Sequence, residues 1–475
     1  MVPRSPLVLI LLIASALAVM ACASQSKAAD RPAPGSAEQQ EEAVTAAALP
    51  DPVDPTGDWE GALLINQLIR LRLVLHVTKS PEGTYAATLD SLDQGAMGLK
   101  VDRFDFNPGT KELDFGLSDI GGAWKGTLEG KQLIGTWSQS GQDFPLTLTF
   151  TTQASAPPPR PQEPQGTLPY QQVDVSFRNP AANITLAGTL TLPEGKGPFP
   201  AVVLISGSGP QDRDEALFGH KPFLVLADHL TRAGIAVLRA DDRGVGASGG
   251  ASVMDVPTSD LAGDVTAAVE YLRSRTEIDD ARIALVGHSE GALIAPMVAN
   301  ANPGKVAAVV LLAPPGVNGE EILYEQGALI ARAAGSTEEA ITRSRGMSRR
   351  MYALLKGPMA DAELRAGLKS ILSEPSPDGG DAPAVSPEAL NAQVDALMSK
   401  WFRFFLTYDP VPVLERLTVP TLAMFGEKDL QVPPSQSEEP VRAALRAAGV
   451  PHEVHVLPGL NHLFQPATTG GPQEY

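Results

Sequence analysis

The sequence predicts a mostly parallel α/β domain with helices on both faces of its sheet and a helical cap insertion, preceded by a small all-β domain. Three observations support this. Apolar runs alternate with helical patterns from Tyr170 onward, short strand-like segments with glycine turns fill 57–150, and a proline-rich segment separates the two regions. The chain has 475 residues, 43% of them hydrophobic, enough for about three folded units.

The first 22 residues have the pattern of a lipoprotein-type signal peptide. Arg4 precedes an apolar run from Leu7 to Met20, which is too short to span a bilayer and suits a signal peptide. The run leads into Ala21-Cys22, a sequence that resembles a bacterial lipobox with Cys22 as the lipidated residue. We expect an exported protein attached to a membrane through Cys22. An ordinary secretory signal, giving a periplasmic or secreted protein, is the alternative.

The charge and cysteine content exclude several classes of binding partner and metal site. The formal net charge is −18, and no Lys/Arg cluster opposes it, so nucleic acid is excluded as a partner. Cys22 is the single cysteine, which excludes intramolecular disulfides, cysteine-built zinc sites and iron–sulfur clusters. Residues 23–56 are rich in Ala, Pro, Gln and Glu without apolar periodicity, and we expect a disordered tether there.

The region 57–150 is expected to form a small antiparallel β sandwich or barrel. Its strand-like segments are 71–77, 85–89, 111–115, 123–128, 133–137 and 145–150. We interpret Trp59, Trp124 and Trp137 as core residues rather than ligand platforms. The segment 151–169 that follows holds six prolines, which favours an extended, semi-rigid linker.

The region 170–475 opens with a predicted hairpin, 173–177 and 184–192, and continues with strand–helix alternation. The strand-like runs are 201–206, 235–240, 282–286, 307–312, 421–425 and 453–457. They are rich in β-branched residues and Leu, as expected of strands buried on both faces. Residues 316–415 interrupt the alternation with Ala-, Glu- and Arg-rich helical sequence. We expect a helical cap there, lying over the carboxyl edge of the sheet as a lid or as a fixed cover.

The sequence Gly287-His288-Ser289-Glu290-Gly291 fits the G-x-S-x-G nucleophile elbow. An elbow requires a strand before the serine and a helix after it, and Ser289 has both. A second match places Ser248 well after its strand and before further turn residues, so we interpret Ser248 as a turn residue. Ser289 is therefore the predicted nucleophile.

A serine nucleophile requires a base and an orienting carboxylate, expected after late strands in the order Ser, acid, His. The strand-like run 421–425 leads to Asp429, the predicted acid, with Glu427 as the rival. The run 453–457 leads to His462, the predicted base. The remaining histidines are interpreted as structural or surface residues: His76, His220, His229, His288, His452 and His455.

An oxyanion in the tetrahedral intermediate requires two backbone N–H donors. One is expected from Glu290, the residue after the nucleophile, and the other from the loop 206–210, where we choose Ser208 with Gly207 and Gly209 as alternatives. A plain glycine-rich turn is the other interpretation of this loop. Two charge-rich loops, 211–215 and 241–244, are expected beside the same edge of the sheet. We hypothesise that Arg213 or Arg243, one on each loop, pairs with a carboxylate such as Glu290 and so fixes the oxyanion loop.

Four motifs together resemble secreted bacterial α/β-hydrolases of the esterase or serine-aminopeptidase-like kind. They are residues 205–214, 242–248, 287–291 and 461–465. The resemblance covers 170–475, and 57–150 looks like the N-terminal extension of some such esterases. It implies the α/β-hydrolase fold and ester hydrolysis by Ser, Asp and His without metal or cofactor. These hydrolases usually end with a helix after the histidine loop, whereas thirteen residues follow His462 here, so we expect a less covered sheet and a looser histidine loop.

Three functions remain open from the sequence. The first is a carboxylesterase that attacks small acyl esters through an acyl-enzyme. The second is a serine-aminopeptidase-like peptidase, which would need carboxylates for the substrate's α-ammonium group, and no motif in 316–415 marks such a site. The third is a catalytically silent envelope binding protein, which predicts a missing triad member, whereas all three candidates are present.

Overall fold

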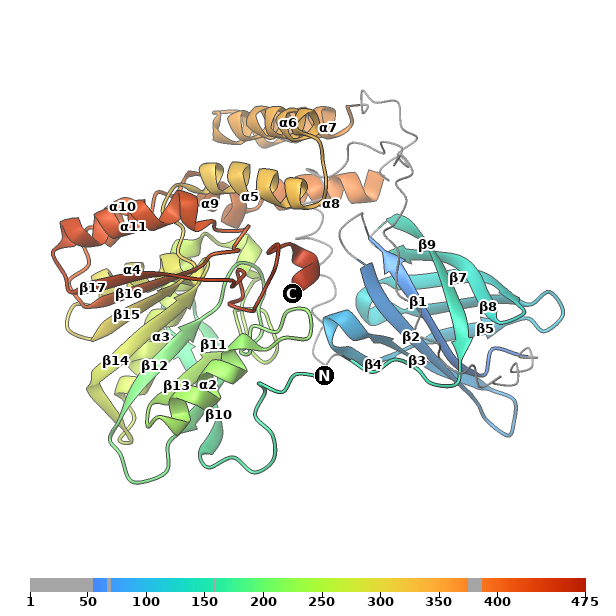
Figure 1. The fold of residues 1–475 in the computed structure, drawn as a ribbon, viewed down its shortest axis with the longest axis horizontal. Helices are drawn as coiled ribbons and strands as arrows, with labels where there is room; N and C mark the ends of the chain where they lie inside the picture. Colours follow the sequence, from blue (N-terminus) through green and yellow to red (C-terminus); the bar gives the residue numbers. More distant parts are fainter. Residues whose placement is uncertain (1–53, 66–69, 140, 158, 375–386) are drawn as a thin grey trace, which may run out of the picture.

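The computed structural model describes residues 54–65, 70–139, 141–157, 159–374 and 387–475. The predicted signal peptide with Cys22, and the tether up to residue 53, lie outside these ranges. Figure 1 shows the described chain as two bodies, an all-β domain and a larger α/β domain. Across the described ranges, no helix is both long enough and apolar enough to cross a bilayer.

The N-terminal domain is one antiparallel sheet with the strand order β4-β3-β2-β1-β9-β8-β7-β6-β5. The strands are β1 (Gly57–Leu64), β2 (Arg70–Lys79), β3 (Tyr85–Ser91), β4 (Ala96–Lys100), β5 (Arg103–Phe106), β6 (Glu112–Leu117), β7 (Gly122–Glu129), β8 (Gln132–Gln139) and β9 (Gln142–Thr151), with short 3-10 turns η1 (Leu92–Gln94) and η2 (Ser118–Ile120). The prediction of an antiparallel β domain is confirmed, but the sheet is a single curved half-barrel rather than two packed sheets (Figure 1).

The core of this domain is aromatic. Trp59, Trp124 and Trp137 are at most 2% exposed, and Phe115 stacks on Trp124 with ring centroids 5.5 Å apart. The indole N–H of Trp59 donates to the carbonyl of Pro55, and that of Trp124 donates to a carbonyl of β9. Buried indoles with satisfied N–H groups are typical of structural cores, in agreement with the interpretation from the sequence.

The linker contacts both domains. The hydroxyl of Ser155 donates to Glu60 of β1 (2.7 Å). The guanidinium of Arg160 donates to the carbonyl of Phe218 (2.8 Å) in the α/β domain, and the Gln162 amide lies 3.3 Å from Nδ1 of His220. The proline-rich segment is therefore hydrogen-bonded both to the β domain and to residues 218–220 of the α/β domain.

The α/β domain contains an eight-stranded sheet in the order β10-β11-β13-β12-β14-β15-β16-β17. The strands are β10 (Gln171–Asn179), β11 (Ile184–Leu192), β12 (Phe199–Ile205), β13 (Ala236–Ala240), β14 (Ile278–His288), β15 (Ala308–Leu312), β16 (Thr421–Gly426) and β17 (His452–Leu457). The first two pairings, β10 with β11 and β11 with β13, are antiparallel, and all later pairings are parallel. The predicted mostly parallel sheet with an opening hairpin is confirmed.

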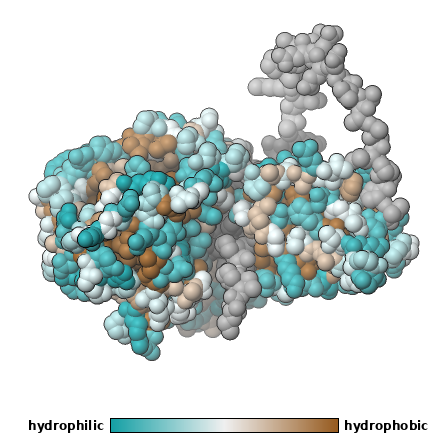
Figure 2. Space-filling view, turned by 90° about the horizontal axis from the view of Figure 1, so that it is seen from below, coloured by the Kyte–Doolittle hydropathy of each residue, from teal (hydrophilic) through white to brown (hydrophobic). Residues whose placement is uncertain are grey.

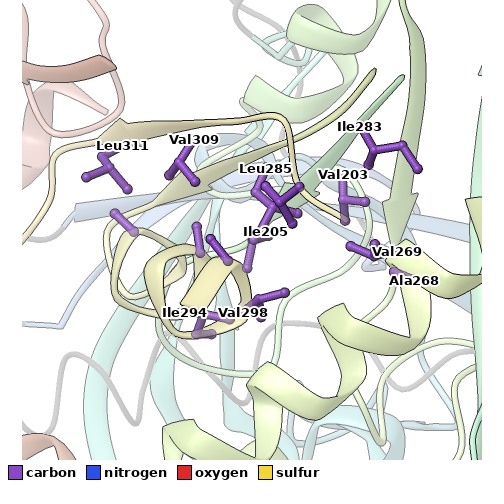
Figure 3. Close-up of a cluster of buried hydrophobic side chains, with 14 of the residues drawn as sticks. Val203, Ile205, Ala268, Val269, Ile283, Leu285, Ile294, Val298, Val309 and Leu311 are labelled. Carbon is purple, nitrogen blue, oxygen red and sulfur yellow. The ribbon is translucent and has the colours of Figure 1, made fainter. Parts of the chain in front are cut away.

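Helices cover both faces of this sheet. The helices outside the cap are α2 (Pro222–Arg232), α3 (Thr258–Arg273), α4 (Gly291–Ala301), α10 (Val411–Leu414) and α11 (Pro434–Ala448), with 3-10 turns η3 (Val253–Asp255) and η4 (Pro472–Glu474). Figure 3 shows Val269 of α3 beside Val203 of β12, and Val298 of α4 near Ile205 of the same strand, within one buried cluster. The helix that follows Ser289 is thereby fixed to the central strands.

The opposite face packs against α2, whose Phe223 and Ala227 contact Val202 and Val237. Toward β15 and β16, apolar side chains on this face are only partly buried, including Leu312. Figure 2 shows a mainly hydrophilic surface with smaller hydrophobic areas on both domains.

A helical insertion follows β15, as predicted. Its helices are α5 (Gly319–Ala333), α6 (Glu338–Lys356), α7 (Asp361–Leu372), α8 (Pro387–Met398) and α9 (Lys400–Thr407). They share a core of their own around Tyr352, Leu368, Val394 and Phe402. In Figure 1 these helices lie above the end of the sheet at which the carboxyl ends of the strands meet, the edge where ligands bind in open α/β sheets.

Candidate active site

Ser289 lies on a sharp turn between a strand and a helix. It directly follows β14 and precedes α4, and its φ of 54° is in the left-handed region that a non-glycine residue rarely adopts. Its N–H donates to the carbonyl of Leu312 at the end of β15 (2.8 Å). The side chain is partly exposed. The strained backbone presents the hydroxyl at the carboxyl edge of the sheet.

The two glycines of the motif are required by close packing. A Cβ at position 287 would lie 2.1 Å from the carbonyl oxygen of Gly291, and a Cβ at position 291 would lie 2.1 Å from the carbonyl oxygen of Ile205. A side chain at position 287 would push α4 away from β14, and one at position 291 would push α4 away from β12. These contacts explain why the sequence turns so tightly at Ser289.

Asp429 and His462 form a buried pair. Oδ2 of Asp429 lies 2.7 Å from Nδ1 of His462, and the two residues are 2% and 4% exposed. Oδ1 of Asp429 accepts the backbone N–H groups of Gln431 (2.8 Å) and Val432 (2.9 Å). Because a carboxylate can only accept, Nδ1 of His462 carries the proton of this bond and Nε2 is left to act as a base.

The loops that carry these two residues are bonded to each other. The N–H of Lys428 donates to the carbonyl of Leu460 (2.8 Å). Asn461 is fully buried, and its Oδ1 accepts the N–H groups of Leu463 and Gln465, both at 3.0 Å. Asn461 therefore holds the histidine loop in shape. Its short polar side chain, capable of bonding to its own loop, was the available sequence signal for this role.

His462 is also brought next to the nucleophile elbow. The rings of His288 and His462 lie 4.7 Å apart, and Nε2 of His288 is 2.9 Å from the backbone oxygen of His462. Ser289 follows His288 directly. The structure thus brings together at one sheet edge the three residues Ser289, Asp429 and His462 that the sequence singled out.

The rival candidates occupy other positions. Ser248 is buried, its hydroxyl donates to the carbonyl of Asp241 (2.8 Å) and accepts the N–H of Ala187 (2.9 Å). Glu427 is half exposed and accepts the N–H of Gly459 (2.8 Å). Both side chains therefore have structural partners.

The loop after β12 lies against the elbow. The N–H of Gly207 donates to Oε1 of Glu215 (2.6 Å), so this alternative oxyanion donor is already used within the protein. Among the described residues, neither the N–H of Ser208 nor that of Glu290 has a hydrogen-bond acceptor. Free N–H groups beside a nucleophile are what an oxyanion site requires.

Arg213 and Arg243 both pair with carboxylates, as hypothesised, but neither pairs with Glu290, the carboxylate named as the example. Arg213 pairs with Asp241 (2.7 Å), and Arg243 pairs with Asp264 (2.7 Å). The start of the oxyanion loop is held by Asp242, whose two oxygens accept Ser206 Oγ (2.8 Å) and the N–H of Gln211 (2.9 Å).

The Glu290 carboxyl connects the elbow to the cap. Oε1 accepts the hydroxyl of Thr258 (2.6 Å) and the indole N–H of Trp401 on α9 (2.7 Å). Glu290 is 2% exposed, and burial raises its pKa. Trp401 stacks on Phe405 with ring centroids 5.4 Å apart. The residue next to the nucleophile therefore contacts a cap helix through its side chain.

Within the described residues, no group of three or more His, Cys, Asp or Glu side chains is placed to hold a metal ion.

Three other histidines, His76, His220 and His288, have structural partners. His76 lies in the β domain between Asp58 (2.8 Å) and Asp90 (3.0 Å). His220 is 6% exposed, and burial lowers its pKa to about 4. Together with His288, these residues have structural contacts, as interpreted from the sequence.

Comparisons with known proteins give matches over parts of this chain. The family model described as serine aminopeptidase, S33, matches residues 221–347, and that of the prolyl oligopeptidase family matches 394–475. Esterase EstD of Thermotoga maritima is 30% identical over 281 residues, which are 59% of this chain and 58% of that protein. The match thus spans less than two thirds of the relative's own length.

Three solved structures resemble part of this chain. GrgF from Penicillium sp. has a TM-score of 0.39 and 20% identity, covering 62% of this chain and 91% of its own. The Pyrococcus furiosus esterase Pf2001 has a TM-score of 0.40 and 16% identity (64% and 88%). Est1E from Butyrivibrio proteoclasticus with bound ferulic acid has a TM-score of 0.36 and 18% identity (61% and 92%).

Proposed function

We propose that this chain, whose α/β domain has the α/β-hydrolase fold and which resembles serine hydrolases of the carboxylesterase kind, hydrolyses small acyl esters. The nucleophile is Ser289, the base is His462 and the orienting acid is Asp429. The observation that carries the proposal is the buried Asp429–His462 pair beside a serine held at a positive φ.

The first half of the reaction forms an acyl-enzyme. Nε2 of His462 takes the proton of the Ser289 hydroxyl as Oγ attacks the ester carbonyl carbon, and the Asp429 carboxylate stabilises the imidazolium that results. The tetrahedral intermediate then collapses, the C–O bond to the alcohol breaks, and His462 returns the proton to the leaving alkoxide. The 2.7 Å contact to Asp429 holds the ring in the tautomer that this transfer needs.

The second half of the reaction repeats the same steps with water. His462 removes a proton from water, the hydroxide attacks the acyl carbon, and Ser289 leaves with the proton that His462 gives back. In both halves the negative oxygen accepts the N–H groups of Ser208 and Glu290. Support for this assignment comes from the absence of any acceptor for these two groups among the described residues.

The proposal is tested by comparing two serines that occupy the same sequence pattern. Purified chain, Ser289→Ala and Ser248→Ala are assayed on p-nitrophenyl esters of increasing acyl length. We expect Ser289→Ala to lose at least about 1,000-fold in kcat, while Ser248→Ala keeps kcat and loses stability with its two hydrogen bonds. An unchanged rate for Ser289→Ala would reject this nucleophile, and an inactive, folded wild type would favour a binding protein.

A peptidase is the second candidate because both family models that match carry peptidase descriptions. Aminoacyl p-nitroanilides, assayed beside the esters, separate the two reactions. An aminopeptidase must bind the substrate's α-ammonium group with a carboxylate. The Glu290 carboxyl nearest to Ser289 in sequence is buried and bonded to Thr258 and Trp401, which argues for the ester reaction.

We also propose that the protein is exported and lipid-anchored through Cys22. The support is the sequence of residues 1–22 alone. Mass spectrometry of the mature N-terminus tests it, with Cys22→Ala as the control. A mature chain that begins at Cys22 with an added diacylglycerol is the expected result, and an unmodified N-terminus would reject the anchor.

A further inference from the structure

Glu215 makes contacts that no sequence motif indicated. It lies on the loop after β12, is 3% exposed and has a φ of 51°, a strained value for a glutamate. Its Oε1 accepts the N–H of Gly207 (2.6 Å) and lies 2.9 Å from Nδ1 of His288. One carboxylate oxygen therefore contacts both the oxyanion loop and the residue that precedes the nucleophile.

His288 extends this contact to the catalytic histidine. Its Nε2 lies 2.9 Å from the backbone oxygen of His462. Both partners of the ring, a carboxylate and a carbonyl, can only accept hydrogen bonds, so both ring nitrogens must donate. With Glu215 ionised, this arrangement favours the imidazolium form of His288. Although burial lowers the pKa of His288, the Glu215 carboxylate raises it above the ordinary value.

The contact between Glu215 and His288 is buried at both ends, since the two side chains are 4% and 7% exposed. The second oxygen of Glu215, Oε2, is buried and has no hydrogen-bond partner among the described residues. Oε1 therefore makes both contacts of this carboxyl group, to Gly207 and to His288.

The oxyanion loop lies directly on the elbow at this point. A Cβ built on Gly207 would lie 3.3 Å from Cβ of Ser289 and 3.5 Å from Nδ1 of His288. The bond from Gly207 to Glu215 thus fixes the loop one residue before Ser208, the proposed oxyanion donor. A displacement of this loop by a few tenths of an ångström would move that donor relative to the Ser289 hydroxyl.

We propose that Glu215 is a positioning residue that sets the oxyanion loop through Gly207 and the His462 loop through His288. This inference rests on the proposed function, because it assigns both loops a part in the reaction at Ser289. Glu215 itself touches no reacting atom. Its loss is expected to weaken stabilisation of the transition state more than binding of the substrate.

The test compares Glu215→Ala with a matched control in the same loop, Asp212→Ala. Asp212 accepts the N–H groups of Asp214 and Ala216, both at 3.0 Å, and contacts neither Gly207 nor His288. Both substitutions remove a carboxylate that accepts two hydrogen bonds. Glu215→Gln is the conservative variant, since its amide oxygen can still accept the N–H of Gly207 without holding the charge of His288.

Kinetics on a p-nitrophenyl ester and thermal unfolding are measured for all variants. We expect Glu215→Ala to lower kcat about 100-fold with KM within about twofold. Glu215→Gln should restore part of the rate, and Asp212→Ala should keep kcat within about twofold of wild type. If Glu215→Ala does not fold, Glu215→Gln alone decides by its kcat at unchanged KM. Equal kcat values for Glu215→Gln and wild type, or equal losses for Asp212→Ala and Glu215→Ala, would overturn the proposal.

A second readout separates this inference from the esterase assignment. A fluorophosphonate probe forms a P–O bond with an activated serine as fluoride leaves, whatever the natural substrate, and intact mass spectrometry follows its attachment to Ser289. If the wild type is labelled but hydrolyses no ester, the esterase assignment fails, and slower labelling of Glu215→Gln than of Asp212→Ala still supports the positioning role. If the wild type is not labelled, both proposals are rejected.

Discussion

Asp241 and Asp242 are consecutive in the chain, yet only the carboxylate of Asp241 meets a cation. Asp241 binds the guanidinium of Arg213 at 2.7 Å. Asp242 has no cationic partner among the described residues and accepts only Ser206 Oγ and the N–H of Gln211. The two neighbouring carboxyl groups therefore have opposite surroundings, one paired with a guanidinium and the other with neutral donors only.

Asp242→Asn should stabilise the protein above neutral pH. Desolvation raises the pKa of Asp242 to about 8, with Glu290 and Glu215 adding to the effect. An acid with a raised folded pKa contributes stability that is lost as pH rises from its unfolded pKa toward its folded one. Relative to wild type, the unfolding equilibrium of Asp242→Asn should therefore improve by up to about tenfold per pH unit between about pH 5 and pH 8. Denaturant unfolding at several pH values checks this, and a constant difference would contradict it.

Asp241→Asn should show the opposite pH trend. Burial raises the pKa of Asp241, but hydrogen bonds from Arg213 outweigh this effect and hold the pKa below its usual range. Stability from a lowered pKa is present above the unfolded pKa and is lost as pH falls through the folded one. We expect Asp241→Asn to cost about 2 kcal/mol at neutral pH, with the cost shrinking in acid. The same unfolding series measures it, and a cost that grows in acid would refute the ionised state.

The orienting acid can be distinguished from its neighbour by an amide substitution at each. Asp429→Asn can no longer hold the tautomer of His462, and kcat should fall about 1,000- to 10,000-fold with the fold intact. Glu427→Gln keeps an oxygen that can accept the N–H of Gly459, and its kcat should stay within about twofold. Ester kinetics and circular dichroism on both variants provide the measurement. A large loss in Glu427→Gln alone would exchange the two assignments.

Trp401→Phe should uncouple the cap from the elbow. It removes the N–H that Glu290 accepts at 2.7 Å and keeps an aromatic ring against Phe405. Because this bond joins the residue after the nucleophile to cap helix α9, its loss should lower kcat/KM about 10-fold. The control is Trp59→Phe in the β domain, which loses the same kind of bond, to Pro55, far from the site and should keep kcat/KM. Equal kinetics for both variants would argue against a role for this contact.

His76 should make the stability of the β domain depend on pH. Burial lowers its pKa, but hydrogen bonds with Asp58 and Asp90 raise it overall above 6.5. Stability from a raised histidine pKa is full below the unfolded pKa and is lost as pH rises through the folded one. The Tm difference between wild type and His76→Gln should thus be larger at about pH 6 than at about pH 9. Tryptophan fluorescence is a suitable probe because three of the four tryptophans lie in this domain's core. A pH-independent difference would contradict the raised pKa.

The fold and the three central site residues could be predicted because their signals are local. A strand, a tight glycine turn and a helix lie within a few residues of Ser289, and Asp429 and His462 each closely follow a strand. The β domain shows the limit of such signals. Alternation predicts strands, but the pairing of β1 with β9, which closes a single curved sheet, depends on contacts some 90 residues apart in sequence.

The supporting contacts of the site could not be predicted for the same reason. Glu215 meets His288 across 73 residues, and Trp401 meets Glu290 across 111. Judged by charge alone, Glu215 and Glu290 could each have paired with a nearby arginine. The hypothesis made from the sequence assumed such a pair for Glu290. Only packing shows that the arginines are used by Asp241 and Asp264 instead.

The linker has a consequence for the motion of the whole molecule. Ser155 is bonded to the β domain, and Arg160 and Gln162, a few residues later, are bonded to the α/β domain. Little chain remains between these contacts to act as a hinge. We therefore expect the two domains to tumble in solution as one particle, with a common rotational correlation time and a scattering profile of fixed shape.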